Sequence, residues 1–394
     1  MPQDHDCRCC PIQAARYCLV AGMGTNMTQI GPLLIGSEVY RGSSYGGQHP
    51  LRVPRVSTVL DLCGAMGWLH QTQYRTSPRA KAKALTAWHT PDYIAALQAA
   101  EAQGTVSDAV RARHHLGTVS NPVFADMFRR PATGAGGVLL AAELLASARS
   151  GAVHVPGGGT HHGLPDRANG FCYLNDPVLG ILALRRAGLR VAYVDIDAHH
   201  ADGVEHAFSG DPDVLLISVH EEGRWPFTGA LGVVGNCVNL PVPRGYNDTE
   251  ARAVLQGLIL PRVAAHRADV VVLQAGADSL TEDPLSRLCL SNNAYRAVLA
   301  GLRALAPRVL LLGGGGYNPW TVGRCWAVLW ADLAGYAVPA VLPEAATAVL
   351  RGLHWGGGGR AAPDAALLTT LADVPREGPL RSEITARLAA LAKG

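Results

Sequence analysis

Charged residues are scarce in this sequence, and long apolar runs are absent from it. Only 16% of the 394 residues are Asp, Glu, Lys or Arg, while 48% are hydrophobic. This composition indicates a large buried core beneath a modest solvated surface. Because no apolar run reaches the roughly 18 residues that a membrane helix requires, no membrane span is predicted. With 34 basic and 31 acidic residues, the net charge of +3 gives no reason to expect direct nucleic-acid binding.

The cysteines lack the pattern of a disulfide framework or of a complete zinc finger. There are nine, an odd number, scattered along a sequence without a recognisable secretory signal. This usage is typical of reduced thiols, so a cytoplasmic location is expected. Cys7, Cys9 and Cys10 lie close together, but no second Cys/His pair follows at finger spacing, so no structural zinc site is expected there.

Near-continuous apolar runs alternate with helical patterns through most of the chain. The alternation predicts a three-layer α/β/α domain around a mostly parallel sheet. Residues 1–32 are interpreted as an N-terminal extension, residues 33–394 as one domain, and residues 356–359 as a loop before a short C-terminal helix. The predicted strands are Ala152–Pro156, Val191–Asp197, Val214–His220, Val270–Ala277 and Val309–Leu312; the predicted helices are Gly136–Ser150, Asn175–Ala187, Asp248–Ala265, Ala294–Ala306 and Thr321–Leu333.

Polar side chains gather where these strands end, which is where ligands bind in such sheets. Asp195, Asp197 and His199 alternate along one strand end and therefore share a face. Burying carboxylates among apolar neighbours is costly unless a cation neutralises them. Asp278 ends another strand, so Asp197, His199 and Asp278 are predicted to bind a metal with one nitrogen and two oxygen ligands. The set is typical of catalytic zinc, although iron(II), manganese and cobalt also suit it.

Two adjacent histidines follow a glycine-rich turn. His161 and His162 are predicted to lie beside the metal and to act on a water molecule. Each imidazole needs a partner that fixes its tautomer, and Asp195 and Asp202 are the available carboxylates. His114 and His115 form a second pair, but no glycine-rich turn or strand end accompanies them, so that pair is interpreted as a helix-end or loop feature.

A tyrosine follows four consecutive glycines at residues 313–316. Glycines allow backbone conformations that other residues avoid, and a flexible turn can bring the Tyr317 phenol to a developing oxyanion. A phosphate-binding loop is the rival interpretation, but the required Gly-Lys-Ser/Thr pattern is absent. Tyr317 is therefore a candidate catalytic residue.

Between about Tyr45 and Leu333 the sequence resembles the zinc-dependent histone deacetylases of the arginase/deacetylase superfamily and their bacterial acetoin-utilisation-type relatives. Residues 334–394 are then expected to form C-terminal helices. The motifs that carry the resemblance are His49-Pro50 with Arg55, His89-Thr90, His161-His162, residues 168–176 (ANGFCYLND), residues 195–203 (DIDAHHADG), residues 274–278 (QAGAD) with Asp283-Pro284, and Gly313 to Tyr317.

The resemblance implies an eight-stranded parallel sheet, zinc at the three ligands named above, and a narrow tunnel with Gly170 and Phe171 in one wall. It also implies two structural potassium ions. The inner ion would lie near Asp195, Asp197, His199, Ser218 and Val219, and the outer ion near Phe208, Asp211 and Val214.

The sequence departs from this family in the segments expected around the tunnel mouth. Protein deacetylases usually carry an aspartate on the rim, whereas residues 117–122 contain no acid. Trp225 and Phe227 are both candidates for the second tunnel wall. Leu285 stands where polyamine-specific members place a glutamate, which argues against polyamines.

The expected activity is hydrolysis of acyl-lysine side chains by a metal-activated water. Deacylation of small acetylated amines is the alternative. The partners expected are an acyl-lysine protein or peptide, or a small acyl-amine; the oligomeric state is left open.

Overall fold

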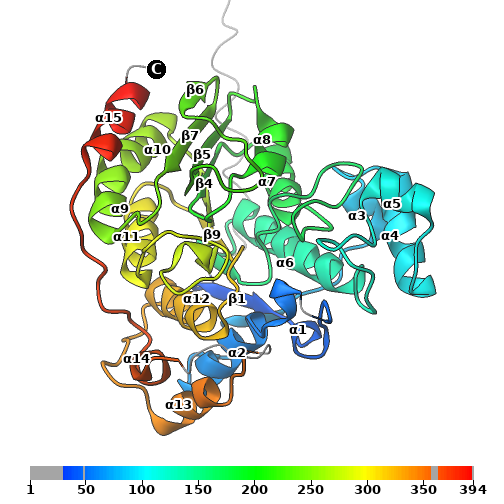
Figure 1. Cartoon of the computed structure of the whole chain (residues 1–394), viewed down its shortest axis with the longest axis horizontal. Helices are drawn as coiled ribbons and strands as arrows, with labels where there is room; N and C mark the ends of the chain where they lie inside the picture. Colours follow the sequence, from blue (N-terminus) through cyan, green and yellow to red (C-terminus); the bar gives the residue numbers. More distant parts are fainter. Residues whose placement is uncertain (1–29, 48, 356–362, 393–394) are drawn as a thin grey trace, which may run out of the picture.

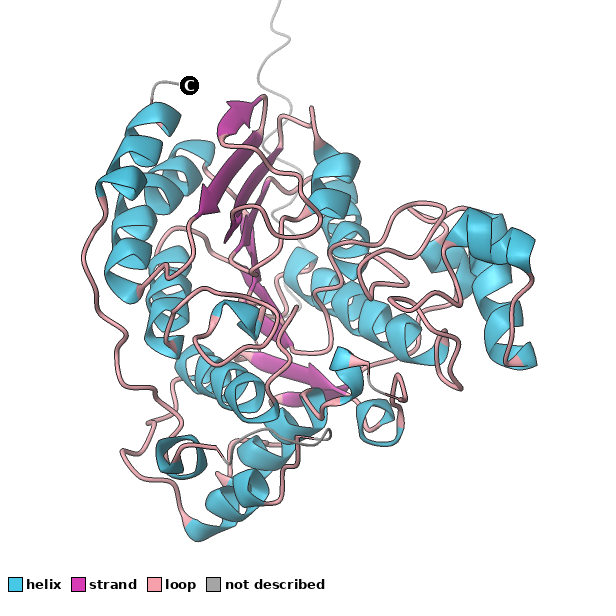
Figure 2. Ribbon diagram, viewed as in Figure 1, coloured by secondary structure: helices cyan, strands magenta, loops and turns pink. Residues whose placement is uncertain are grey.

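The computed structural model describes residues 30–47, 49–355 and 363–392, and its centre is one twisted sheet with helices on both sides (Figures 1 and 2). The strand order is β2-β1-β3-β9-β8-β4-β5-β7-β6. The strands are β1 Leu33–Gly36, β2 Tyr74–Thr76, β3 Ala152–Val155, β4 Val191–Asp195, β5 Val214–Glu221, β6 Gly232–Val234, β7 Cys237–Val242, β8 Val270–Gln274 and β9 Val309–Leu312.

The first eight strands of that order run parallel, as the resemblance implies. The sheet nevertheless has nine strands, because β6 adds to its edge in the antiparallel direction through pairs such as Val233 with Val238. β6 and β7 are separated by only two residues, so a tight hairpin connects them. The expectation of eight strands is therefore one strand short.

The strands are buried on both faces, which explains their continuous apolar sequences. In β4, Val191 and Tyr193 pack on one helical layer, while Ala192 and Val194 pack on the other. The first layer consists of α6 Arg129–Ala146, α7 Asp176–Arg186 and α8 Asp202–Phe208; the second includes α2 Val56–Ala65, α9 Asp248–Val254, α10 Leu260–His266, α11 Asn292–Arg303 and α12 Pro319–Ala334.

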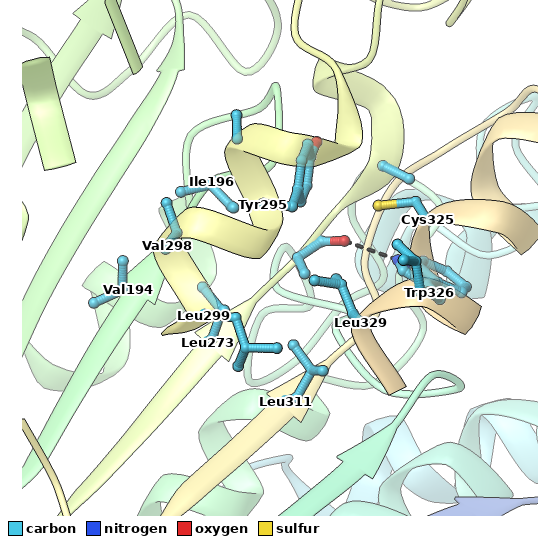
Figure 3. Packing of buried hydrophobic residues seen from close by; sticks show 14 of the residues in the cluster. Val194, Ile196, Leu273, Tyr295, Val298, Leu299, Leu311, Cys325, Trp326 and Leu329 are labelled. Atoms are coloured by element: carbon cyan, nitrogen blue, oxygen red, sulfur yellow. Dashed lines mark hydrogen bonds between the residues drawn. The ribbon is translucent and has the colours of Figure 1, made fainter. Parts of the chain in front are cut away.

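The second layer contains the largest apolar side chains of the core (Figure 3). Trp326 of α12 and Tyr295 of α11 are fully buried against Leu273 and Leu311 of the sheet. The indole N–H of Trp326 donates to the carbonyl of Ala275, 2.8 Å away. This bond joins α12 to the segment directly after β8, which leads into the candidate site.

Three helices lie outside the two main layers. α3, α4 and α5 form a lobe beside α6, with its own apolar core around Tyr93, Leu97 and Met127 (Figure 1). Among the described residues, no helix combines the length and apolar character needed to cross a bilayer. The bounds are α1 Val39–Gly42, α3 Ala82–Leu85, α4 Pro91–Gln103, α5 Asp108–His114, α13 Glu344–Arg351, α14 Ala365–Thr369 and α15 Ser382–Leu391, with 3-10 turns at Pro50–Arg52 and Ala277–Ser279.

The helix expected at Gly136–Ser150 spans Arg129–Ala146, and another predicted helix is interrupted. Residues 248–265 were expected to form a single α-helix, but a π-helical segment, Leu255–Ile259, separates α9 from α10. Pro261 lies in the first turn of α10, where it cannot donate the hydrogen bond that a continuous helix requires. The wider π turn shifts the direction of the following side chains without ending the helical path.

Candidate active site

The three predicted metal ligands converge because β4 and β8 are neighbours. Asp195, at the end of β4, lies opposite Gln274, at the end of β8. Asp197 and His199 extend beyond β4, and Asp278 lies in the short turn after β8, so their ligand atoms all come within 4.8 Å of one another. The two strands are separated by a long stretch of sequence, but the sheet brings their ends together.

Backbone N–H groups hold both carboxylates in place. Ala198 N–H donates to Asp278 Oδ1 at 2.9 Å, and Gly315 N–H donates to Asp197 Oδ2 at 2.7 Å. His199 Nδ1 lies 2.9 Å from Asp278 Oδ2. Burial, together with the charge of Asp197, raises the pKa of Asp278 to about 6. Two fully buried carboxylates beside one imidazole are a donor set that fits a divalent cation.

Glycines make this packing possible. A Cβ at Gly276 would lie 1.9 Å from Asp197 Oδ2, and a Cβ at Gly315 would lie 2.1 Å from Asp278 Oδ2. Gly314 and Gly316 also have positive φ angles, of +135° and +126°. The glycine run was interpreted as a source of flexibility, but its contacts show a need for space beside the ligands.

The two predicted histidine–aspartate pairs are present. His161 Nδ1 lies 2.7 Å from Asp195 Oδ2, and His162 Nδ1 lies 2.6 Å from Asp202 Oδ1. These contacts fix Nδ1 of each ring and leave the Nε2 atoms for chemistry in the cavity. Two supporting groups were not predicted from the sequence: the Tyr193 hydroxyl donates to Asp195 at 2.6 Å, and Asn169 Nδ2 donates to Asp202 at 3.0 Å.

The surroundings shift the pKa values of the two histidines in opposite directions. Burial lowers the pKa of His162 to about 4, and the charge of His161 adds to this effect. Burial acts the same way on His161, but the charges of Asp195 and Asp197 outweigh it and raise its pKa to about 9. Adjacent groups with opposite shifts are a frequent property of acid–base sites.

A third buried histidine supports the loop that carries this pair. His89 accepts the Asn175 backbone N–H at Nε2, 3.0 Å away, and its Nδ1 lies 3.0 Å from the carbonyl of Leu164. Asn175 Nδ2 in turn donates to the carbonyl of His161. His89 must be neutral to accept at Nε2, and its burial lowers its pKa to about 4.

We therefore expect His89 to make the fold sensitive to mild acid. Between pH 6.5 and 4 an unfolded histidine binds a proton that the folded one excludes, so stability falls as the pH is lowered through this window. The loss at pH 5 is about 2 kcal/mol from this residue. Urea unfolding at pH 7.5 and pH 5 measures this change in the free energy of unfolding. The free energy of unfolding of His89→Gln should fall less on acidification than that of the wild type. An equal loss in both proteins would contradict this role.

Tyr317 lies at the edge of the same cavity, as predicted. Its backbone N–H donates to Asp283 Oδ2 at 2.7 Å, and its ring lies 6.0 Å from that of Phe171. Asp283 Oδ1 also accepts the Leu285 N–H at 2.8 Å. Asp283, which had no assigned role, thus positions both the candidate catalytic tyrosine and a residue of the tunnel wall.

The expected tunnel residues Gly170, Phe171, Trp225, Phe227 and Leu285 all line one cavity of about 620 Å³, together with His162, His199 and Tyr317. The cavity thus brings candidate catalytic residues and the expected tunnel residues together.

The structure also assigns the second wall. The Trp225 ring lies 4.7 Å from that of His162, and a Cβ on Gly170 would come within 2.2 Å of it. Phe227 is 75% exposed and lies at the outer edge. Trp225 is therefore the inner wall.

The rim segment 117–122 carries a support rather than an acid. Ser120 lines the mouth of the cavity, and its carbonyl lies 3.2 Å from His49 Nε2. Asn121 Oδ1 accepts the Phe171 N–H at 3.1 Å. The ring of His49 meets that of Phe171 edge-on at 4.5 Å. His49 and Asn121 thus hold the tunnel wall, while no carboxylate of this segment reaches the substrate side.

Two other sequence interpretations have clear outcomes. His114 is the last residue of α5 and His115 is its left-handed cap, with φ of 56°, so this pair is a helix end as expected. Cys7, Cys9 and Cys10 lie outside the described residues.

The positions expected around the inner potassium ion lie together at the ends of β4 and β5, where Asp195 pairs with Ser218. The Ser218 hydroxyl lies 2.9 Å from His220 Nδ1 and accepts the Ala201 N–H at 3.4 Å. An ion there stays a prediction.

The outer position fits a cation less well. Asn236 Nδ2 donates to the carbonyls of both Phe208 and Val214, at 2.8 and 2.7 Å. Asn236 Oδ1 also accepts the Gly210 N–H at 2.7 Å. The amide thus binds the carbonyls of two of the three residues near which the resemblance places the outer potassium ion, and an ion bound to these carbonyls would have to displace it.

Replacing Asn236 with alanine should therefore destabilise the protein and create a response to potassium. The loss of these hydrogen bonds is expected to cost about 1–3 kcal/mol. Because the freed carbonyls can bind an ion only in the folded state, KCl should raise the melting temperature of the variant more than that of the wild type, relative to choline chloride. Asn293→Ala, which removes an amide bonded to the carbonyl of Asp373, is the control. If KCl raised the melting temperature of all three proteins equally, the idea that the Asn236 amide occupies the place of a potassium ion would be contradicted.

Comparisons with known proteins agree with this geometry. Residues 49–333 match the histone deacetylase domain. The chain belongs to the histone deacetylase family. It is 34% identical over 303 residues to histone deacetylase 8 of Xenopus tropicalis, covering 74% of this chain and 82% of that protein. It is 32% identical over 320 residues to the acetoin utilization protein AcuC of Bacillus subtilis (strain 168), covering 77% of this chain and 82% of that protein.

A solved structure shows the same family fold. The crystal structure of a histone deacetylase homologue from Aquifex aeolicus superimposes with a TM-score of 0.86 at 34% identity, covering 91% of this chain and 99% of that one. A structure described as a histone deacetylase homologue complexed with SAHA matches with the same figures. The family likeness thus extends to residues beyond the matched domain.

Proposed function

We propose that this family member is a zinc-dependent amidohydrolase that removes acetyl or other short acyl groups from acyl-lysine side chains. One observation carries the proposal: the buried cluster of Asp197, His199 and Asp278 adjoins, through His199, a cavity whose walls include His162 and Tyr317 as well as the apolar side chains of Phe171, Trp225 and Leu285. A lysine side chain is a long apolar stem, which such walls accommodate.

Each part of the site has a task in this reaction. Asp197, His199 and Asp278 would hold the zinc ion, which when bound polarises an acyl oxygen and lowers the pKa of water. Nε2 of His162 accepts the proton of the attacking water and then returns it to the leaving amine nitrogen, with His161 beside it. The Tyr317 hydroxyl donates to the oxygen that becomes negative as the carbonyl carbon turns tetrahedral. Asp195 and Asp202 hold the two rings.

Direct assay of the purified protein tests the proposal. Acetate release is measured from an acetyl-lysine peptide beside acetylated small amines, at matched concentration. Faster hydrolysis of acetyl-lysine is expected. Hydrolysis of the small amines alone would favour the alternative substrate class, and no hydrolysis of any amide would refute the proposed chemistry.

Hydroxamates with a lysine-like stem should inhibit at micromolar concentration. The stem would occupy the cavity beside Phe171 and Trp225, and the hydroxamate would chelate the zinc held at its end. Inhibition constants are compared for a hydroxamate and for the same molecule with a carboxamide in its place. Equal inhibition by both compounds would show that binding does not involve the proposed metal.

A further inference from the structure

Charged residues line the active-site cavity, and its acids are paired with arginines while two of its arginines are not paired with acids. The residues that line the cavity include two acids, Glu221 and Glu222, and three arginines, Arg224, Arg244 and Arg287. Both acids are neutralised by the chain itself. Glu221 binds Arg224 through contacts of 2.5 and 2.8 Å, and Glu222 accepts from Arg387 at 2.9 Å.

The other two arginines have no such partner. Within the described residues, neither Arg244 nor Arg287 lies within salt-bridge distance of a carboxylate. The Arg287 guanidinium donates to the backbone carbonyls of Pro284 and Ser286, at 3.4 and 2.8 Å, which hold it without cancelling its charge. Both arginines are exposed.

The backbone segments that carry these two arginines lie side by side. Gly245 N–H donates to the Arg287 carbonyl at 2.7 Å, and Cys289 N–H donates to the Tyr246 carbonyl at 2.8 Å, so segments 244–246 and 287–289 run together. Arg287 also follows Leu285 of the tunnel wall by two residues. Both arginines therefore line the cavity from neighbouring segments, and neither is among the predicted catalytic or metal-binding residues.

We infer that Arg244 and Arg287 select substrates that carry a carboxylate outside the tunnel, next to the acyl-lysine stem. This inference rests on the proposed function and names its substrate class. Arginine pairs well with carboxylates because its donors form a planar fork. The segment 117–122 on the rim adds no acid that would repel such a group. The carboxylate belongs either to an acidic residue beside acyl-lysine in a peptide or to the α-carboxylate of acyl-lysine itself.

Matched peptides test the inference. The wild type is assayed on peptides in which acetyl-lysine is flanked by aspartate, by asparagine or by arginine, with all other residues the same. We expect kcat/KM for the aspartate peptide to exceed that for the asparagine peptide roughly 3- to 10-fold, as for two exposed ion pairs. The difference should lie in KM, because the arginines do not touch the reacting atoms. It should shrink in 0.5–1 M NaCl, a range chosen so that salt screens exposed charges.

Variants assign the preference to these two side chains. In the double variant Arg244→Gln/Arg287→Gln the ratio between aspartate and asparagine peptides should approach one, and in Arg244→Glu/Arg287→Glu the arginine peptide should become the better substrate. Each ratio is measured within one protein sample, so a loss of folded enzyme cancels. Arg303→Gln is the control, because Arg303 is also exposed and donates to a backbone carbonyl, that of Asp332 in α12. It should keep the wild-type ratio.

A second pair of substrates identifies the source of the carboxylate. Nα-blocked acetyl-lysine is compared as its free acid and as its carboxamide. A preference for the free acid points to the α-carboxylate, whereas a preference confined to the flanked peptides points to a neighbouring acidic residue; either supports the inference.

Equal hydrolysis of acidic, neutral and basic substrates by the wild type would overturn the inference and leave the proposed function intact. The same holds if the preference persists in the Arg244→Gln/Arg287→Gln variant. Failure to hydrolyse any acyl-lysine substrate would instead refute the proposed function, and the inference would fall with it.

Discussion

Asp278→Asn is expected to reduce activity below detection and to lower the bound metal from one ion per chain. Asp278 is fully buried, and its Oδ2 lies 2.9 Å from His199 Nδ1. The amide keeps the size of the carboxylate, and its single oxygen, placed at Oδ1, can still accept the Ala198 N–H. It removes one of the two negative charges that favour a divalent cation. Metal content is measured by elemental analysis and folding by thermal melting.

A matched control separates metal loss from general damage. Asp269→Asn changes a carboxylate that accepts one backbone N–H, that of Arg190, at the other end of the sheet. This variant should keep both metal and activity. Full activity of metal-stripped wild-type protein, or of Asp278→Asn without metal, would refute the assignment of this cluster.

Tyr317→Phe should lower kcat by roughly 10²–10³-fold while KM changes little. The substitution removes one hydroxyl from the cavity and keeps the ring that packs on Phe171. The backbone N–H bond to Asp283 is also unaffected, so the loop should stay in place. Because the hydroxyl donates to a charge that develops only in the transition state, its loss should act on the rate rather than on binding.

Two comparisons make this test specific. Trifluoroacetyl-lysine has an electron-withdrawing acyl group that needs less help from an oxyanion donor, so its hydrolysis should fall less than that of acetyl-lysine. Tyr93→Phe is the control, because Tyr93 is buried and its hydroxyl donates to the Tyr173 carbonyl, away from the cavity. A wild-type kcat for Tyr317→Phe on acetyl-lysine would show that Tyr317 only packs.

The sequence predicted the elements whose physical signal is strong. Continuous apolar runs identified β3, β4, β5, β8 and β9, which are buried on both faces. β1, β2, β6 and β7 were missed: the first three have only three or four residues each, and Pro241 interrupts the otherwise strand-like run of β7. The π segment at Leu255–Ile259 has no sequence pattern that distinguishes it from an ordinary helix.

The site could be predicted where function requires unusual residues. Carboxylates beside apolar strands drew attention to Asp195, Asp197 and Asp278. Supporting groups such as Asn169 and Tyr193 have side chains that are common elsewhere. Only their contacts with the carboxylates of the two histidine–aspartate pairs distinguish them. The choice between Trp225 and Phe227 likewise depended on the path of the backbone, since both are aromatic and close in sequence.

The strand order has a consequence for synthesis on the ribosome. β3 and β4 leave the ribosome before β8 and β9, yet β9 and β8 lie between them in the finished sheet. The nascent chain therefore cannot close its centre until residue 312 has emerged, and the two strands already made must stay apart until then. Asp197 and His199 likewise meet Asp278, and the Gly315 N–H that holds Asp197, only after those later residues have emerged. The candidate metal-binding cluster is thus complete only late in translation, when the last two strands insert.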